Sequence, residues 1–172
     1  MPSSLTEPNF YLVGFMGAGK STIGPLLAEK LGTRFYDLDL LIEDAEKLTV
    51  RQIFESRGEP YFRRKEAELL MPLTQLRSMV IALGGGTFVQ QANRALICPT
   101  GTTIWLNVPF ALIQQRIQDP LSRPLFRSPQ EMELLFQQRL PFYQMADIEF
   151  PVGVEPAEAI AERLFRRLKE GG

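Results

Sequence analysis

Histidine is absent from this chain of 172 residues, and cysteine occurs once, at Cys98. Without histidine the chain can build neither a Ser-His-Asp nor a Cys-His nucleophile arrangement, and the usual zinc sites lose a main ligand. A single cysteine also excludes a disulfide framework and a cysteine metal cluster within the chain. Any acid–base chemistry must therefore rest on carboxylates.

An excess of charge of one sign is also lacking. The formal net charge is -1, so there is no bulk electrostatic reason to expect a nucleic-acid or membrane partner. The apolar runs are too short to span a bilayer, and the N-terminus lacks the basic-then-apolar pattern of a secretion signal. We therefore expect a cytoplasmic protein and, by default, a monomer.

Short apolar segments alternate with helical patterns, which predicts a single α/β domain with a mainly parallel sheet. A helix with apolar spacing over Ile23–Leu31 should end at Gly32, with an irregularity at Pro25. Capping boxes at 49–52 and 128–131 predict helices beginning at 50 and at 129, the second extending through 139. Further helices are predicted over 59–76 and from 156. The predicted strands are 10–13, 34–36, 79–83, 102–106 and 148–150.

One motif carries the strongest chemical information. The residues from Gly14 to Thr22, GFMGAGKST, follow the apolar run Tyr11–Val13 and match the phosphate-binding loop pattern G-x-x-x-x-G-K-[ST]. Glycines let successive backbone N–H groups converge on phosphate oxygens, and the next helix presents its N-terminus to the anion. Lys20 should reach the terminal phosphates, and the Ser21 hydroxyl is the expected protein ligand of Mg²⁺.

Two aspartates, Asp37 and Asp39, follow the second predicted strand. On an extended segment they would point to the same side, where one could hold Mg²⁺ through water and the other could bind an acceptor hydroxyl. The strand predicted over 79–83 offers no carboxylate, which assigns the metal role to Asp37. Gly84–Gly86 indicates either backbone pressed against a ligand or a tight turn.

Arginines supply the remaining candidates. Arg63 and Arg139 carry the planar, permanently charged fork that suits carboxylate recognition. The irregular segment 118–127 contains two prolines and two arginines. It can be either a mobile basic flap that excludes water or a plain surface loop.

Taken together, these motifs resemble the shikimate kinase family in order and spacing over essentially the whole chain. The resemblance implies a P-loop NTPase fold of the nucleoside-monophosphate-kinase type, with three α/β/α layers and a five-stranded parallel sheet. It also implies a shikimate-binding region at about 38–66 and a lid at about 117–130. The matching segments are Gly14–Gly24, Asp37–Asp39, Ile53–Phe54, Gly58–Glu59, Phe62–Arg63, Leu83–Gly86, Arg123–Leu125, and Arg139 with Tyr143.

The resemblance implies transfer of the ATP γ-phosphate to the 3-hydroxyl of shikimate, a step of aromatic amino acid biosynthesis, with Mg²⁺ as cofactor. The implied catalytic residues are Lys20, Asp39 and the lid arginine Arg123. ATP would be bound by Gly17, Ala18, Gly19, Lys20, Ser21, Thr22, Arg116 and Arg123. Shikimate would be bound by Asp39, Arg63, Gly84, Gly85, Gly86 and Arg139, with Glu66 orienting Arg63. Mg²⁺ would be held by Ser21 and Asp37.

Two alternatives stay open on the sequence. One is a kinase of another small acceptor, such as gluconate or a nucleoside monophosphate. The other is a shikimate-kinase-like protein that binds nucleotide but has lost catalysis and serves as a regulatory or interaction module.

Overall fold

The computed structural model describes residues 7–117 and 128–171. Within these residues five strands form one parallel sheet in the order β2-β3-β1-β4-β5. Each strand lies within one residue of its predicted ends, so the predicted α/β class is confirmed. The strands are β1 (Asn9–Val13), β2 (Phe35–Asp37), β3 (Val80–Ala82), β4 (Gly101–Asn107) and β5 (Ile148–Pro151).

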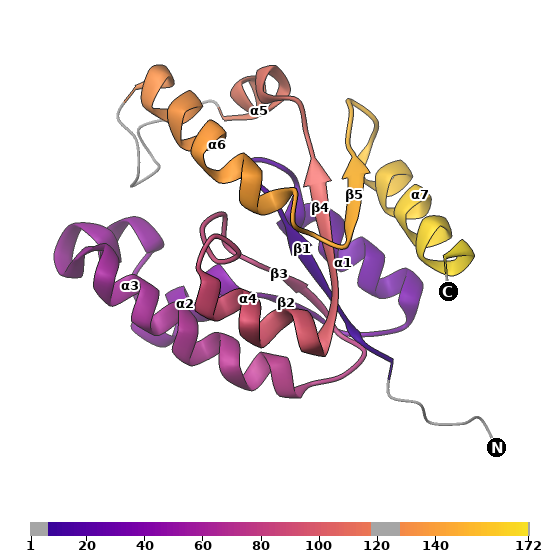
Figure 1. Ribbon diagram of the computed structural model, residues 1–172, viewed down its shortest axis with the longest axis horizontal. Helices are drawn as coiled ribbons and strands as arrows, with labels where there is room; N and C mark the ends of the chain where they lie inside the picture. The colour runs from indigo at the N-terminus through magenta and orange to yellow at the C-terminus, as the bar shows by residue number, and fades with distance from the viewer. Residues whose placement is uncertain (1–6, 118–127, 172) are drawn as a thin grey trace.

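Helices cover both faces of the sheet and complete three layers. Figure 1 shows α1 and α7 together on one side of the strands, with α3, α4 and α6 on the other. None of the helices in the described parts of the chain combines the length and the apolar character needed to cross a bilayer. The α-helices are α1 (Lys20–Leu31), α2 (Leu38–Glu46), α3 (Val50–Gln75), α4 (Gln91–Ile97), α5 (Phe110–Arg116), α6 (Pro129–Tyr143) and α7 (Ala157–Glu170); a short 3-10 turn, η1, spans Cys98–Thr100.

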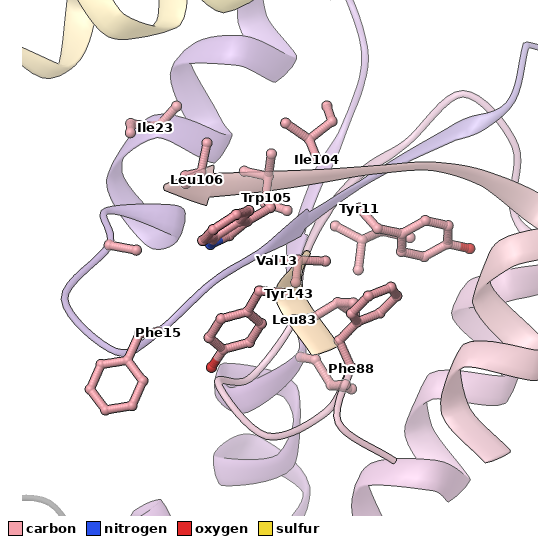
Figure 2. Packing of buried hydrophobic residues seen from close by; sticks show 14 of the residues in the cluster. Tyr11, Val13, Phe15, Ile23, Leu83, Phe88, Ile104, Trp105, Leu106 and Tyr143 are labelled. Carbon is pink, nitrogen blue, oxygen red and sulfur yellow. The ribbon is translucent and has the colours of Figure 1, made fainter. Parts of the chain in front are cut away.

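The central strand, β1, explains where a ligand can bind. It pairs with β3 on one side and β4 on the other, and Tyr11, Leu12 and Val13 are at most 1% exposed. A strand buried on both faces is mainly apolar, as Tyr11–Val13 are, and Figure 2 shows Tyr11 and Val13 among the packed core side chains. The strand order reverses at β1, and in open α/β sheets ligands bind beyond the carboxyl ends of the strands at such a reversal.

Local capping signals fix the helix starts as predicted. Thr49 accepts a hydrogen bond from the Gln52 amide at 3.2 Å, while the Gln52 side chain accepts one from the Thr49 amide at 2.8 Å. Ser128 likewise accepts from the Glu131 amide at 3.2 Å and begins α6. Gly58, with φ 80°, kinks α3, so the two helices predicted around it are the two halves of α3.

Other helix predictions were wrong or incomplete. Helix α1 runs unbroken through Pro25, without the expected irregularity. Helix α6 continues past 139 to Tyr143. The extended conformation expected around Asp39 was wrong, because Asp37 ends β2 and caps α2, so Asp39 lies in the first helical turn. Helices α2, α4 and α5 were not predicted.

Candidate active site

The phosphate-binding loop connects β1 to α1, as its motif predicts. Gly19 caps α1 in the left-handed conformation, with φ 96°, which only glycine adopts without strain. Beside it lies a hollow, called here the loop hollow. It is lined by Met16, Gly17, Gly19, Lys20, Ser21, Thr22, Asp37, Asp39, Ala82, Leu83 and Gly85. Ala18, the remaining predicted loop residue, has its side chain buried in the core.

Lys20 is a buried cation at the floor of this loop. Its Nζ donates hydrogen bonds to the carbonyl oxygens of Gly14 at 2.6 Å and Phe15 at 3.0 Å. These contacts hold the ammonium group inside the curve of the loop. The charge, the loop amides and the α1 N-terminus all favour an anion in the loop hollow.

Ser21 and Asp37 lie together at the start of α1 and the end of β2. The Ser21 hydroxyl donates to Asp37 Oδ2 at 2.5 Å, and Asp37 Oδ1 accepts from the Leu40 amide at 3.3 Å. A hydroxyl and a carboxylate oxygen are ligands that Mg²⁺ prefers, and Mg²⁺ commonly keeps several waters besides one or two protein ligands. The described residues contain no cluster of three acidic or cysteine side chains able to hold a metal alone. The pair therefore fits a metal shared with a bound phosphate.

Asp39 is the most electrostatically perturbed carboxylate of the site. Its Oδ1 atom is covered and has no hydrogen-bond partner among the described residues. Burial of the carboxyl, together with the charges of Asp37 and Glu66, raises its pKa to about 6, against an opposing contribution from Lys20. A covered acceptor without a donor is costly. Oδ1 can therefore accept a hydrogen bond from a hydroxyl of a bound molecule.

Arg63 is held by two carboxylates on α3. Its Nη1 donates to both oxygens of Glu66 at 3.0 Å, and its Nε and Nη2 donate to Glu59 at 3.3 and 3.2 Å. Glu66 is fully buried, and the contact agrees with its predicted function of orienting Arg63. Buried ion pairs of this kind fix the direction of a guanidinium group.

Arg139 enters the same region from α6. It is 6% exposed, and no carboxylate among the described residues forms an ion pair with it. Its guanidinium carbon lies 5.8 Å from the centre of the Phe15 ring. A buried guanidinium without a counterion within the described protein favours an anionic group in the adjoining space.

The Gly84–Gly86 segment forms a tight turn, in which the Thr87 amide donates to the Gly84 carbonyl at 3.0 Å. Because glycine has no side chain, side chains from other elements can lie close to the backbone of this turn. A Cβ at Gly84 would lie 2.7 Å from Asp39 Oδ1, one at Gly85 would lie 2.9 Å from Arg139 Nη1, and one at Gly86 would overlap the Arg63 guanidinium. Each glycine thus leaves room for one predicted acceptor-binding side chain.

These side chains line a second hollow, called here the arginine hollow. It adjoins the loop hollow, because Met16, Asp39 and Gly85 line both. Two guanidinium groups, a carboxylate and an apolar wall therefore face one space next to the phosphate-binding loop. The lining residues are Met16, Asp39, Val50, Phe54, Phe62, Arg63, Glu66, Gly84, Gly85, Gly86 and Arg139.

Arg116 lies at the other end of the loop, away from the arginine hollow. Its guanidinium donates to the carbonyl oxygens of Gly17 at 3.2 Å and Gly153 at 3.0 Å. It thereby joins the phosphate-binding loop to the segment after β5, next to a third hollow lined by Gly17, Gly19, Thr22, Ile23, Arg116, Glu155, Ala157 and Ile160. Arg123 and most of the predicted lid lie outside the described residues.

Comparison with known proteins decides the family. The shikimate kinase family profile matches residues 16–169. Curated shikimate kinases from Sulfurihydrogenibium sp. and Synechococcus sp. are 36% and 41% identical, covering 94% and 95% of this chain and 98% and 86% of their own lengths. The chain belongs to the shikimate kinase family.

A solved structure of the family supports the same assignment. Shikimate kinase from Acinetobacter baumannii, in complex with shikimate, superposes with a TM-score of 0.91 at 36% identity. The match covers 96% of this chain and 95% of that one. The nucleoside-monophosphate-kinase-like fold expected from the sequence is thereby confirmed.

Several residues that line the site were not predicted from the amino-acid sequence. Met16 lines both hollows, and the apolar wall of the arginine hollow comes from Val50, Phe54 and Phe62. Phe54 and Phe62 belong to segments that match the shikimate kinase family, but their spacing also fits ordinary core residues. No signal in the sequence therefore distinguished a residue that lines the site from one that only packs in the core. Thr87, whose hydroxyl donates to Glu66 at 2.6 Å, and Tyr143, whose hydroxyl donates to the Gly85 carbonyl at 2.5 Å, were not predicted as site residues either.

Proposed function

We propose that this chain is a shikimate kinase, which transfers the γ-phosphoryl group of ATP to the 3-hydroxyl of shikimate and yields shikimate 3-phosphate and ADP. The observation that carries the proposal is the meeting of the two hollows at Asp39. One hollow has the features of a phosphate site. The other combines a carboxylate with two arginines, which suits an acceptor bearing both hydroxyls and a carboxylate.

On the donor side, Lys20 would exchange its carbonyl contacts for the β- and γ-phosphate oxygens. Gly17–Thr22 would surround the phosphates, and Arg116 would contact the base. Ser21 and Asp37, the latter through water, would hold Mg²⁺, which when bound offsets phosphate charge. Arg123 is predicted to add positive charge from the lid.

On the acceptor side, Arg63 and Arg139 would bind the shikimate carboxylate, and the Gly84–Gly86 backbone would close around the ring. The Acinetobacter baumannii relative, solved with shikimate, supports this choice of acceptor. Asp39 Oδ1 would accept the hydrogen bond of the 3-hydroxyl and direct its oxygen toward the γ-phosphorus. As the new O–P bond forms, the bond to the ADP oxygen breaks, and the hydroxyl proton passes to Asp39 or solvent.

Catalysis of this kind requires mainly positioning and charge, because phosphoryl transfer has a loose transition state. Asp39 with a pKa of about 6 is ionised at neutral pH and is therefore able to accept the hydroxyl proton. We further propose that the enzyme acts in the cytoplasm as a monomer, without nucleic-acid or membrane partners.

The test is an assay of ADP release with a panel of acceptors at fixed ATP and Mg²⁺. We expect saturable turnover with shikimate and none above background with gluconate or nucleoside monophosphates. Turnover with gluconate instead would favour the small-acid alternative. ATP binding without turnover on any acceptor would favour the regulatory alternative.

A further inference from the structure

Two buried hydroxyl groups outside the proposed catalytic set belong to residues that are hydrogen-bonded to the Gly84–Gly86 turn. The first belongs to Thr87, which is fully buried. Its hydroxyl donates to Glu66 Oε1 at 2.6 Å, while its backbone amide closes the turn onto Gly84. Thr87 thus joins the turn to the carboxylate that holds Arg63.

A third buried polar residue strengthens this side. The Asn93 side-chain amide of α4 donates to the Thr87 carbonyl at 3.1 Å and to Glu66 Oε2 at 3.4 Å. Glu66 therefore receives donors from Arg63, Thr87 and Asn93. A buried carboxylate needs such donors to remain charged and in one orientation.

The second hydroxyl belongs to Tyr143, which is 1% exposed. It donates to the Gly85 carbonyl at 2.5 Å, and a Cβ at Gly85 would lie 2.9 Å from Nη1 of Arg139, one helical turn earlier on α6. Burial raises the pKa of Tyr143 to about 12, so the phenol remains a donor at any working pH. Figure 2 shows its ring beside Trp105, with ring centres 6.4 Å apart, so the core limits its movement.

We propose that Thr87 and Tyr143 are positioning residues that together fix the two arginines relative to the glycine turn and so determine preference for an acceptor with a carboxylate. Thr87 acts through Glu66 on Arg63, and Tyr143 acts through Gly85, which lies against Arg139. Both residues are hydrogen-bonded to the glycine turn, which therefore fixes the position of each relative to the other. Gly85 of this turn is 58 residues from Tyr143 along the chain. This inference rests on the proposed function, because shikimate supplies the carboxylate.

The variants are Thr87→Val and Tyr143→Phe, each of which removes a hydroxyl and little else. Matched controls exist in the same protein. Thr74→Val removes a buried hydroxyl that bonds only within α3, to Met71 at 2.7 Å. Tyr11→Phe removes a buried phenol hydroxyl that contacts Thr100, at the far end of the sheet. Thr87→Ser keeps the hydroxyl and should restore the function that Thr87→Val loses.

Steady-state kinetics of ADP release measure the effect, with shikimate and its methyl ester as acceptors. We expect each variant to raise the KM for shikimate by about tenfold, with the KM for ATP unchanged, because a buried hydrogen bond that fixes the immediate surroundings of one arginine is lost. The ratio of kcat/KM for shikimate to that for the ester should fall by a similar factor. The two controls and Thr87→Ser should leave that ratio unchanged.

Equal losses on both acceptors would show general loosening of the structure and overturn the proposal, as would variants that behave like the controls. A wild-type protein that neither binds nor phosphorylates shikimate would overturn the proposed function and this inference with it. Wild-type activity together with an unchanged ratio in both variants would overturn this inference alone.

Discussion

At the residue scale, the buried charge of Asp39 lowers the stability of the fold, and the proposed mechanism requires that charge. An aspartate in the unfolded chain has a pKa of 3.8, whereas burial raises the pKa of native Asp39 to about 6. Between these values the native state retains a proton that the unfolded chain has lost, so this residue's contribution to stability falls as the pH rises through the window. Well above pH 6 the buried charge of Asp39 lowers the free energy of unfolding by its full amount.

The substitution Asp39→Asn tests this cost. Urea unfolding at pH 8 should give the variant a free energy of unfolding that is larger than wild type by about 3 kcal/mol, because the buried charge is gone. At pH 4 the two proteins should unfold at nearly the same urea concentration. A variant that is less stable than wild type at pH 8 would contradict the account of Asp39.

The pH dependence of turnover follows from the same group. With wild type, kcat/KM for shikimate should rise with pH and reach half its plateau near pH 6, as Asp39 becomes ionised and able to accept the hydroxyl proton. Asp39→Asn should lower kcat by about 10² or more and show no such rise. A profile that is flat between pH 5 and 8 in wild type would rule out this assignment.

At the element scale, α3 begins with a capping box and carries Val50 and Phe54 to the wall of the arginine hollow. Thr49→Ala should lower the free energy of unfolding by about 1 kcal/mol, because the Gln52 amide loses the hydroxyl that accepts its hydrogen bond. Ser56→Ala is the control, since this exposed hydroxyl donates back to the Gln52 carbonyl inside the helix and should be nearly neutral. Equal effects of the two substitutions in chemical denaturation would argue against the cap.

The glycine turn makes a different prediction, because the atoms next to Gly86 belong to the end of a side chain. Gly86→Ala should raise the KM for shikimate by about tenfold or more by displacing the Arg63 guanidinium, while the KM for ATP stays the same. Gly171→Ala, whose Cβ would meet nothing nearer than 3.4 Å, is the control. An unchanged KM for shikimate in Gly86→Ala would place Arg63 outside the acceptor site.

Some helices and strands could be predicted from the sequence and others could not. The strands and capped helices were predictable, because apolar runs and capping boxes are local signals. Helix α2 was not predictable, because the run Asp37-Leu38-Asp39-Leu40 alternates between polar and apolar residues like a strand. In the folded chain the Asp37 cap and the burial of Leu38 and Ile42 stabilise a helix there instead. The short helices α4 and α5, of seven residues each, carry too few turns for a periodic pattern.

At the scale of the whole molecule, the sheet brings together segments that are distant in the chain. The phosphate-binding loop, Asp37 and the glycine turn leave neighbouring strands at the same edge, so their meeting follows from a parallel sheet. The bond from Tyr143 to Gly85 and the network around Glu66 depend on how α6, α3 and α4 pack. No spacing in the sequence encodes that packing, which is why their contacts could not be predicted.

The central claim is that the two hollows are the donor and acceptor halves of one phosphoryl-transfer site. Phosphorus NMR of the protein with ATP, Mg²⁺ and shikimate tests it most directly. We predict a new phosphomonoester signal coupled to the ring proton at C3, growing in step with ADP. Release of ADP with inorganic phosphate alone, or a phosphate on another hydroxyl, would contradict the account.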